Sequence, residues 1–260
     1  SNGFVNRRSS VQIRQEAPPK RPPESKWSRG LPSFPRSAFP RSAFPRSGAG
    51  GRATLRSMSR LNDLLVSQLA RPHGLLTGPM SALLNRGNRL ITAHTVGALD
   101  LQPGDAVLDV GFGGGVGLDM VRAHEPGAKL AGVDISGDVV KRARPRYRDV
   151  TLVEAGVEAM PFEDARFDAV FAVNVVYFWP DLPAAYRELL RVLRPGGRLA
   201  LGIRPASTLA RFEFASSGHR EWNPAQYAEA LAAAGFVATS ARRMPDPEGG
   251  AYVVRGERPR

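Results

Sequence analysis

The stretch Ala106-Val107-Leu108-Asp109-Val110-Gly111-Phe112-Gly113-Gly114-Gly115 decides the fold of this 260-residue chain. A short apolar run that ends in a glycine-rich loop predicts a buried strand over 106–110, followed by a helix near 116–125. Glycines after a strand permit a left-handed backbone and let a ligand approach closely. In open parallel sheets, ligands bind outside the carboxyl ends of the strands. We therefore expect the functional site at this loop.

Strands and helices alternate on the carboxyl side of this loop. The further predicted strands are 129–133, 150–153, 167–173, 198–203, 237–242 and 251–255. Asp181 and Asn223, the latter followed by Pro224, are good caps for two of the intervening helices. This alternation predicts an α/β, Rossmann-like fold with a seven-stranded, mostly parallel sheet and helices on both faces. The last two strands have no helix between them, so we expect an antiparallel C-terminal hairpin.

Composition separates a basic arm, residues 1–56, from a folded domain, residues 57–260. The arm carries +10 of the formal charge of +12, together with eight prolines and few aliphatic side chains. Such a segment cannot bury enough apolar surface to fold, so we expect it to be disordered. A solvated tail is the favoured interpretation; capture of single-stranded nucleic acid and an organellar leader are the alternatives. Within the domain, we expect covering helices over 57–104 and a catalytic sheet over 105–260.

Several classes of protein are excluded or disfavoured by the composition. The chain has no cysteine, which excludes disulfides, thiolate nucleophiles and cysteine-ligated metal centres. Its four histidines are scattered, so no metal site is expected. No apolar run reaches the roughly 18 residues of a membrane span. We expect a cytoplasmic protein of unknown oligomeric state.

Two acidic residues indicate which nucleoside cofactor the loop binds. Asp134 ends the second strand, where a carboxylate accepts hydrogen bonds from the two hydroxyls of an adenosine ribose. Asp109 precedes the glycines, where it would repel a pyrophosphate but suits an ammonium group. The spacing also places Val116 where a dinucleotide fingerprint needs its third glycine. These residues favour S-adenosylmethionine over NAD.

The sequence resembles the class I S-adenosylmethionine-dependent methyltransferases, in particular the small-molecule group around the ubiquinone and menaquinone C-methyltransferases. The segments that carry the resemblance are Val107–Gly115, Gly132–Ser136, Val157–Phe162 and Leu190–Leu199. It implies that these segments, the last excepted, hold the methionine, ribose and adenine parts of the cofactor in turn. The expected cofactor-binding residues are Asp109, Gly111, Phe112, Gly113, Gly115, Asp134, Ile135, Val157, Glu158 and Asn174.

The chain departs from the family pattern at Gly156. Family members usually carry an aspartate there, and its carboxylate accepts a hydrogen bond from the adenine amino group. In this chain the backbone N–H of Val157 would recognise adenine, with Glu154 or Glu158 compensating for the missing carboxylate.

The acceptor site is expected where the fourth strand ends, at Asn174–Asp181. Tyr177, Phe178 and Trp179 could form the wall of an acceptor pocket, or could pack against the neighbouring helix. His94, His219 and Tyr177 are the candidate catalytic residues. The segment lacks the Asn/Asp-Pro-Pro-Tyr/Phe pattern of enzymes that methylate exocyclic amines, which disfavours nucleobase N-methylation.

The sequence thus predicts transfer of a methyl group from S-adenosylmethionine to an oxygen, nitrogen or carbon atom of a small molecule. The first alternative is an RNA methyltransferase that captures its substrate with the basic arm. The alternatives from other classes are an NAD-dependent oxidoreductase and a cofactor-binding protein without catalytic activity.

Overall fold

The computed structural model describes residues 88–205, 223–245 and 250–260. The basic arm, most of the predicted covering helices and His219 lie outside the described residues. Within them, residues 88–97 are helical and lie in the range 57–104, where covering helices were predicted. No helix of the described segments is long and apolar enough to cross a membrane.

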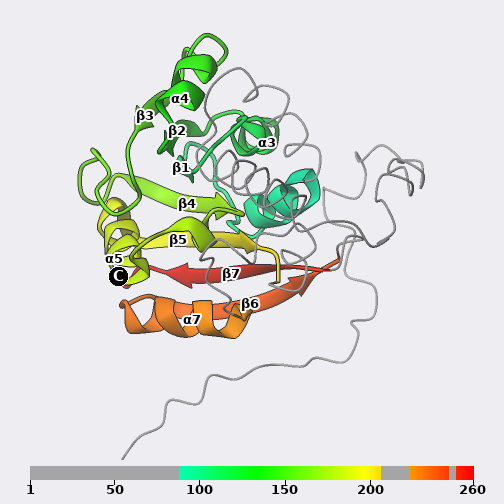
Figure 1. The fold of residues 1–260 in the computed structure, drawn as a ribbon, viewed down its shortest axis with the longest axis vertical. Helices are drawn as coiled ribbons and strands as arrows, with labels where there is room; N and C mark the ends of the chain where they lie inside the picture. Colours follow the sequence, from blue (N-terminus) through cyan, green and yellow to red (C-terminus); the bar gives the residue numbers. More distant parts are fainter. Residues whose placement is uncertain (1–87, 206–222, 246–249) are drawn as a thin grey trace, which may run out of the picture. The chain divides into compact units, whose positions relative to one another are not determined.

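The strands form one seven-stranded sheet in the order β3-β2-β1-β4-β5-β7-β6, which runs from top to bottom in Figure 1. Their bounds are β1 Ala106–Val110, β2 Lys129–Asp134, β3 Thr151–Glu154, β4 Phe167–Val173, β5 Leu193–Ile203, β6 Val237–Met244 and β7 Ala251–Glu257. Strands β1 to β5 pair in parallel, and β7 pairs antiparallel with both β5 and β6. The predicted sheet and C-terminal hairpin are confirmed.

The helices follow the strands as the alternation predicts. Their bounds are α3 Val116–His124, α4 Gly137–Ala143, the 3-10 turn η1 Val176–Phe178, α5 Leu182–Val192 and α7 Pro224–Ala233. Both predicted caps are present: Asp181 accepts a hydrogen bond from the N–H of Ala184, and Asn223 forms a capping box with Gln226.

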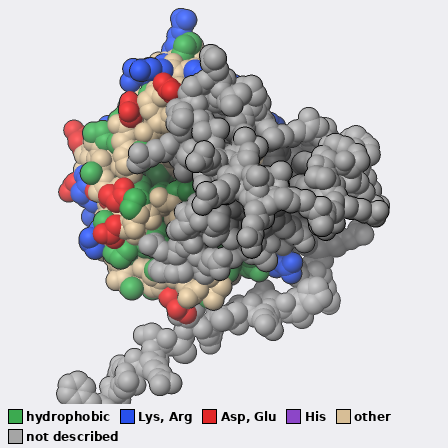
Figure 2. All heavy atoms as spheres, viewed as in Figure 1, with side chains coloured by type: hydrophobic (Ala, Val, Ile, Leu, Met, Phe, Trp, Pro, Cys, Tyr) green, Lys and Arg blue, Asp and Glu red, His purple; other side chains and the backbone are tan. Residues whose placement is uncertain are grey.

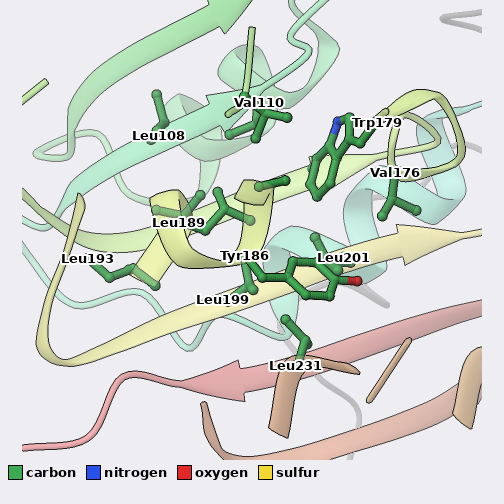
Figure 3. Close-up of a cluster of buried hydrophobic side chains, with 14 of the residues drawn as sticks. Leu108, Val110, Val176, Trp179, Tyr186, Leu189, Leu193, Leu199, Leu201 and Leu231 are labelled. Atoms are coloured by element: carbon green, nitrogen blue, oxygen red, sulfur yellow. The ribbon is translucent and has the colours of Figure 1, made fainter. Parts of the chain in front are cut away.

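Alternate residues of the buried strands face opposite layers of the core. Leu108 of β1 and Leu199 of β5 pack with Leu189 of α5 and Leu231 of α7 on one face (Figure 3). Residues of the opposite parity, such as Phe171 of β4, pack with α3 and the helix 88–97 on the other face. Helices therefore cover both faces, as the apolar runs predict for a buried parallel sheet.

One boundary differs from the prediction. Helix α5 ends at Val192 and β5 begins at Leu193, although the sequence predicted that this strand begins at Arg198. The register with β4 shifts at this point, and Gly196 donates a hydrogen bond to the carbonyl of Arg258 near the end of the chain. Pairing with a segment 62 residues away therefore keeps this stretch in the sheet as a bulge.

Candidate cofactor and acceptor site

The glycine loop lies at the carboxyl end of β1 and needs glycine at several positions. Gly111, Gly113 and Gly115 have φ angles of 73°, 51° and 82°, in the left-handed region. A Cβ atom on Gly111 would lie 2.7 Å from Cγ1 of Val175, which follows β4. The loop is therefore shaped both by its backbone conformation and by the close approach of the neighbouring strand end.

Asp134, at the end of β2, fixes the same loop from its other side. Its Oδ2 accepts a hydrogen bond from the N–H of Gly113 at 3.0 Å, and its Oδ1 accepts one from the N–H of Ser136 at 3.0 Å. The N–H of Gly111 also donates to the carbonyl of Val133 at 2.7 Å. The predicted ribose carboxylate and the predicted methionine loop therefore lie in direct contact.

Asp109 and Asp134 form a pair of buried carboxylates at this loop. Burial, and then the charge of Asp134, raise the pKa of Asp109 well above its usual range. Burial also raises the pKa of Asp134, while the N–H groups of Ser136 and Gly113 oppose that shift. The pair makes the loop favourable for a cation and unfavourable for a phosphate.

Tyr147 supports the glycine loop through its hydroxyl, and the sequence alone did not predict this role. We call Tyr147 and the side chains that contact it the brace. Its hydroxyl lies 3.0 Å from the carbonyl oxygen of Gly115 and 2.9 Å from Oδ1 of Asp119 on α3, both of which are acceptors. A Cβ atom on Gly115 would collide with this hydroxyl. No local signal distinguishes this tyrosine within a basic stretch, because its partners lie 28 and 32 residues away.

Arg146, in the basic stretch 141–148, and Arg122 on α3 also contact Tyr147. The guanidinium groups of Arg122 and Arg146 lie 5.8 Å and 5.1 Å from the centre of the Tyr147 ring, and Arg146 pairs with Asp119. Basic side chains gather over α4 at the top of Figure 2, with acidic ones next to them. The cluster is thus partly neutralised where it meets α3.

The segment expected under the adenine follows β3. Val157 is buried in the core, and Glu158 lies beside it in a turn. Ile135, just after Asp134, is 43% exposed, although large aliphatic side chains are usually buried. An exposed isoleucine next to the predicted ribose carboxylate offers apolar surface to a flat ring. Phe112, by contrast, packs its side chain in the core, so only its backbone could contact a ligand.

Asn174 and Tyr177 form a hydrogen-bonded chain at the carboxyl end of β4. The Asn174 amide donates to Oδ1 of Asn88 at 2.8 Å, and its Oδ1 accepts from the Tyr177 hydroxyl at 2.9 Å. That hydroxyl also accepts from the N–H of Arg204 at 2.6 Å. Burial raises the pKa of Tyr177. Asn174 itself has a φ of 55°, in the left-handed region, so these hydrogen bonds hold it in a strained backbone conformation.

The two other aromatic residues of this segment differ in their surroundings. Trp179 is buried in the core and packs edge-on against Tyr186 of α5, with ring centres 6.3 Å apart. This is the helix packing that the sequence left open as an alternative. Phe178 is half-buried and meets the Tyr177 ring edge-on at 6.1 Å, so it retains exposed apolar surface.

His94 is half-buried on the helix 88–97, the helix that also supplies Asn88. This helix packs closely on β5, because a Cβ atom on Gly202 would collide with the Thr95 hydroxyl. The structure thus places the helix with His94 beside the carboxyl end of the sheet. The segment that contains His219 lies outside the described residues.

Comparisons with known proteins show which sequences and folds this chain resembles. The family model described as "Methyltransferase domain" matches residues 108–201, which run from β1 to β5. An uncharacterized methyltransferase of Bacillus subtilis, YdaC, is 30% identical over 52% of this chain and 75% of its own length. The 27-O-demethylrifamycin SV methyltransferase of Amycolatopsis mediterranei is 39% identical over 47% of each chain.

Solved structures show the same fold at low identity. A chain of the complex between the Trm112 methyltransferase activator of Haloferax volcanii and a methyltransferase superposes with a TM-score of 0.62. The alignment covers 70% of this chain and 95% of that chain, with 21% identity.

Proposed function

Because the chain belongs to the class I S-adenosylmethionine-dependent methyltransferases, we propose that the carboxyl ends of β1, β2 and β3 bind S-adenosylmethionine. We further propose that a small organic molecule accepts the methyl group beside the carboxyl end of β4. When bound, S-adenosylmethionine supplies a methyl group on a cationic sulfur.

The buried carboxylate pair carries this proposal. Asp109 and Asp134 hold raised pKa values in an apolar site, and the unfavourable energy of their charges falls when a cation binds. The ammonium and sulfonium groups of S-adenosylmethionine are such cations. A dinucleotide would instead bring a pyrophosphate against Asp109. The chemistry of the donor set therefore fits this cofactor better than NAD.

The loop residues divide the binding between them. The Asp109 carboxylate lies against α3, where a Cβ atom on Gly117 would collide with its Oδ2, and it faces the methionine ammonium. The left-handed glycines 111, 113 and 115 shape the loop beside it. Asp134 gives its oxygens to the two ribose hydroxyls, in place of or in addition to its present N–H partners. Ile135 and the Val157 backbone flank the adenine ring.

The residues at the end of β4 orient the acceptor. Methyl transfer is an in-line displacement, so the protein mainly holds two reactants in register and excludes water. Phe178 provides apolar surface for the acceptor, and Asn174 provides a polar contact to the methionine part of the cofactor. Tyr177 acts through Asn174 and is a positioning residue. His94 is the candidate base, needed only for an acceptor that does not ionise readily.

The chemistry of the acceptor is supported by the relatives and by the sequence of this segment. The rifamycin relative acts, by its name, on a small molecule. Asn174-Val175-Val176-Tyr177 lacks the prolines of enzymes that methylate exocyclic amines of bases. A small acceptor with an oxygen, nitrogen or carbon nucleophile is therefore favoured over a nucleobase.

Titration calorimetry of the full chain tests the proposed cofactor. S-adenosylmethionine and S-adenosylhomocysteine should bind, and NADH should not. Asp134→Ala should weaken the binding of S-adenosylmethionine and of S-adenosylhomocysteine by about a hundredfold or more, because two charge-assisted hydrogen bonds are lost. Asp138→Ala, on the exposed first turn of α4, is the matched control and should bind as the wild type does. Undiminished binding to the Asp134 variant would refute the assignment.

A further inference from the structure

Glu158 carries a buried oxygen without a donor. Its Oε1 has no hydrogen-bond partner, and it is one of few such side-chain atoms among the described residues. A buried acceptor without a donor is unfavourable by about 1 to 3 kcal/mol, and such atoms in native proteins need an explanation. A ligand that brings a donor to Glu158 would remove this penalty.

The turn that presents Glu158 is fixed at both ends. The N–H of Ala155 donates to the carbonyl of Asp134 at 3.1 Å, and the N–H of Ala159 donates to the carbonyl of Gly156 at 3.3 Å. After the turn, the N–H of Met160 donates to Oε1 of Glu188 on α5 at 2.7 Å. The turn that carries Glu158 therefore begins next to the end of β2, where Asp134 lies.

Two glutamates near this turn have opposite surroundings. Glu188 is paired with Arg191 at 2.7 Å in addition to the Met160 N–H, and these contacts lower its pKa. Arg191 uses its remaining donors on Asp164 and on the carbonyls of Met160 and Phe162. Arg191 thus directs its N–H donors to partners other than Glu158.

The carboxylate of Glu158 fills the space that Gly156 leaves. A Cβ atom on Gly156 would lie 3.1 Å from Oε2 of Glu158. The other acidic residue of this region, Glu154, leans over Gly137 at the start of α4 instead, where a Cβ atom would collide with its carboxylate. Of the two glutamates, only Glu158 thus lies over position 156.

We propose that the Glu158 carboxylate accepts a hydrogen bond from the 6-amino group of the cofactor adenine and selects for that base. This inference rests on the proposed function, because a ribose held by Asp134 on β2 leaves its base over the adjacent β3, whose last residue pairs with Asp134 in the sheet. The terminal torsion of glutamate is soft, so a small rotation turns either oxygen toward the ligand. The carboxylate that the family usually carries at 156 is supplied here from position 158.

The test compares two ligands that differ only in the base. S-adenosylhomocysteine carries the 6-amino donor, and S-inosylhomocysteine carries a carbonyl acceptor in its place. We expect the wild-type full chain to prefer the adenine ligand by about tenfold or more, because two facing acceptors repel each other. In Glu158→Gln the side-chain amide can donate to the carbonyl, so the preference should fall below about threefold or reverse. A purely structural role for Glu158 would lower both affinities equally.

Three further variants complete the test. Glu163→Gln, at an exposed position, should keep the wild-type preference, and so should Glu154→Gln. Gly156→Asp combined with Glu158→Ala should restore the preference, because the carboxylate returns at 156. The inference is overturned if Glu158→Gln keeps a tenfold preference or if Glu154→Gln alone removes it. If the wild type binds neither S-adenosylmethionine nor S-adenosylhomocysteine, the proposed function itself fails.

Discussion

The glycine-loop region (residues 109–117 with Asp134 and Tyr147) and the Asn174 region (Asn88, Asn174, Tyr177 and Arg204) lie at the same edge of the sheet but are built differently. The first leaves two buried carboxylates with raised pKa values at a loop, Gly111–Gly115, in which every residue except Phe112 is glycine. The second joins the side chains of Asn88, Asn174 and Tyr177 to one another and to the backbone N–H of Arg204. Buried charges that are unfavourable in the free protein can be stabilised by a bound ligand. Polar groups that already hydrogen-bond to one another instead stabilise the local structure.

The largest expected effect comes from adding one methyl group to the glycine-loop region. Gly115→Ala should weaken S-adenosylmethionine binding by about a hundredfold, because the new Cβ atom displaces the Tyr147 hydroxyl and shifts the loop. Gly104→Ala is a matched control, since Gly104 also has a φ of 82° but has nothing within 4 Å of its Cβ position. The control should lose only about 1 to 2 kcal/mol of unfolding free energy from backbone strain. Equal binding losses in both variants, measured by calorimetry, would remove the distinction between the two positions.

Two tyrosine-to-phenylalanine variants should show opposite effects. Tyr177→Phe should lower the free energy of unfolding by about 2 kcal/mol, because Arg204 N–H and Asn174 Oδ1 lose a buried partner. Tyr147→Phe should cost less stability but weaken cofactor binding about threefold to tenfold, because the Gly115 carbonyl is released. Denaturant unfolding and calorimetry on both variants separate the two readouts. If Tyr177→Phe affects cofactor binding more than Tyr147→Phe, the assignment of the two regions is reversed.

The carboxylate pair makes a prediction about pH. The folded protein holds the Asp109 proton to a higher pH than the unfolded chain does, so the free energy of unfolding falls as pH rises from the ordinary aspartate range through the raised pKa. Asp109→Asn should flatten this dependence and raise stability at pH 7 by about 1 kcal/mol. It should also weaken binding of the cationic cofactor, whose affinity in the wild type tightens as Asp109 ionises. A variant that is less stable than the wild type at pH 7 would contradict the burial penalty.

The smallest effect is expected at the surface of the brace. Arg122 and Asp149 form an ion pair at 2.7 Å whose side chains are 39% and 73% exposed. Arg122→Ala should therefore change the free energy of unfolding by less than about 1 kcal/mol, and salt should reduce even this difference. Cofactor affinity should not change, because the Tyr147 hydroxyl and not the arginine contacts the loop. If Arg122→Ala lost as much cofactor affinity as Tyr147→Phe, the basic side chains and not the Tyr147 hydroxyl would support the glycine loop.

The same comparison explains what the sequence could predict. The sheet and the glycine-loop residues Asp109, Gly111, Gly113 and Asp134 were predictable, because a strand, its loop and the end of the next strand lie within about 25 residues. Alternating apolar residues and helix caps encode these elements locally.

Other features depend on distant partners and could not be predicted. Asn174 meets Asn88 across 86 residues, and Tyr147 meets Gly115 across 32. The start of β5 at Leu193 depends on its pairing with Phe167 of β4 and on the hydrogen bonds of Gly196 and Gly197 to Arg258. Whether Trp179 packs in the core or borders a pocket depends on Tyr186, which only the folded chain brings to it. No periodicity or spacing in the sequence encodes such contacts.

A structure of the full chain with bound S-adenosylhomocysteine tests the central claim most directly. We predict that the two ribose hydroxyls lie within hydrogen-bonding distance of the Asp134 carboxylate and that the amino-acid end of the ligand lies along Gly111–Gly115 beside Asp109. This prediction would be contradicted by a ligand bound elsewhere in the protein, or by a ribose that makes no contact with Asp134.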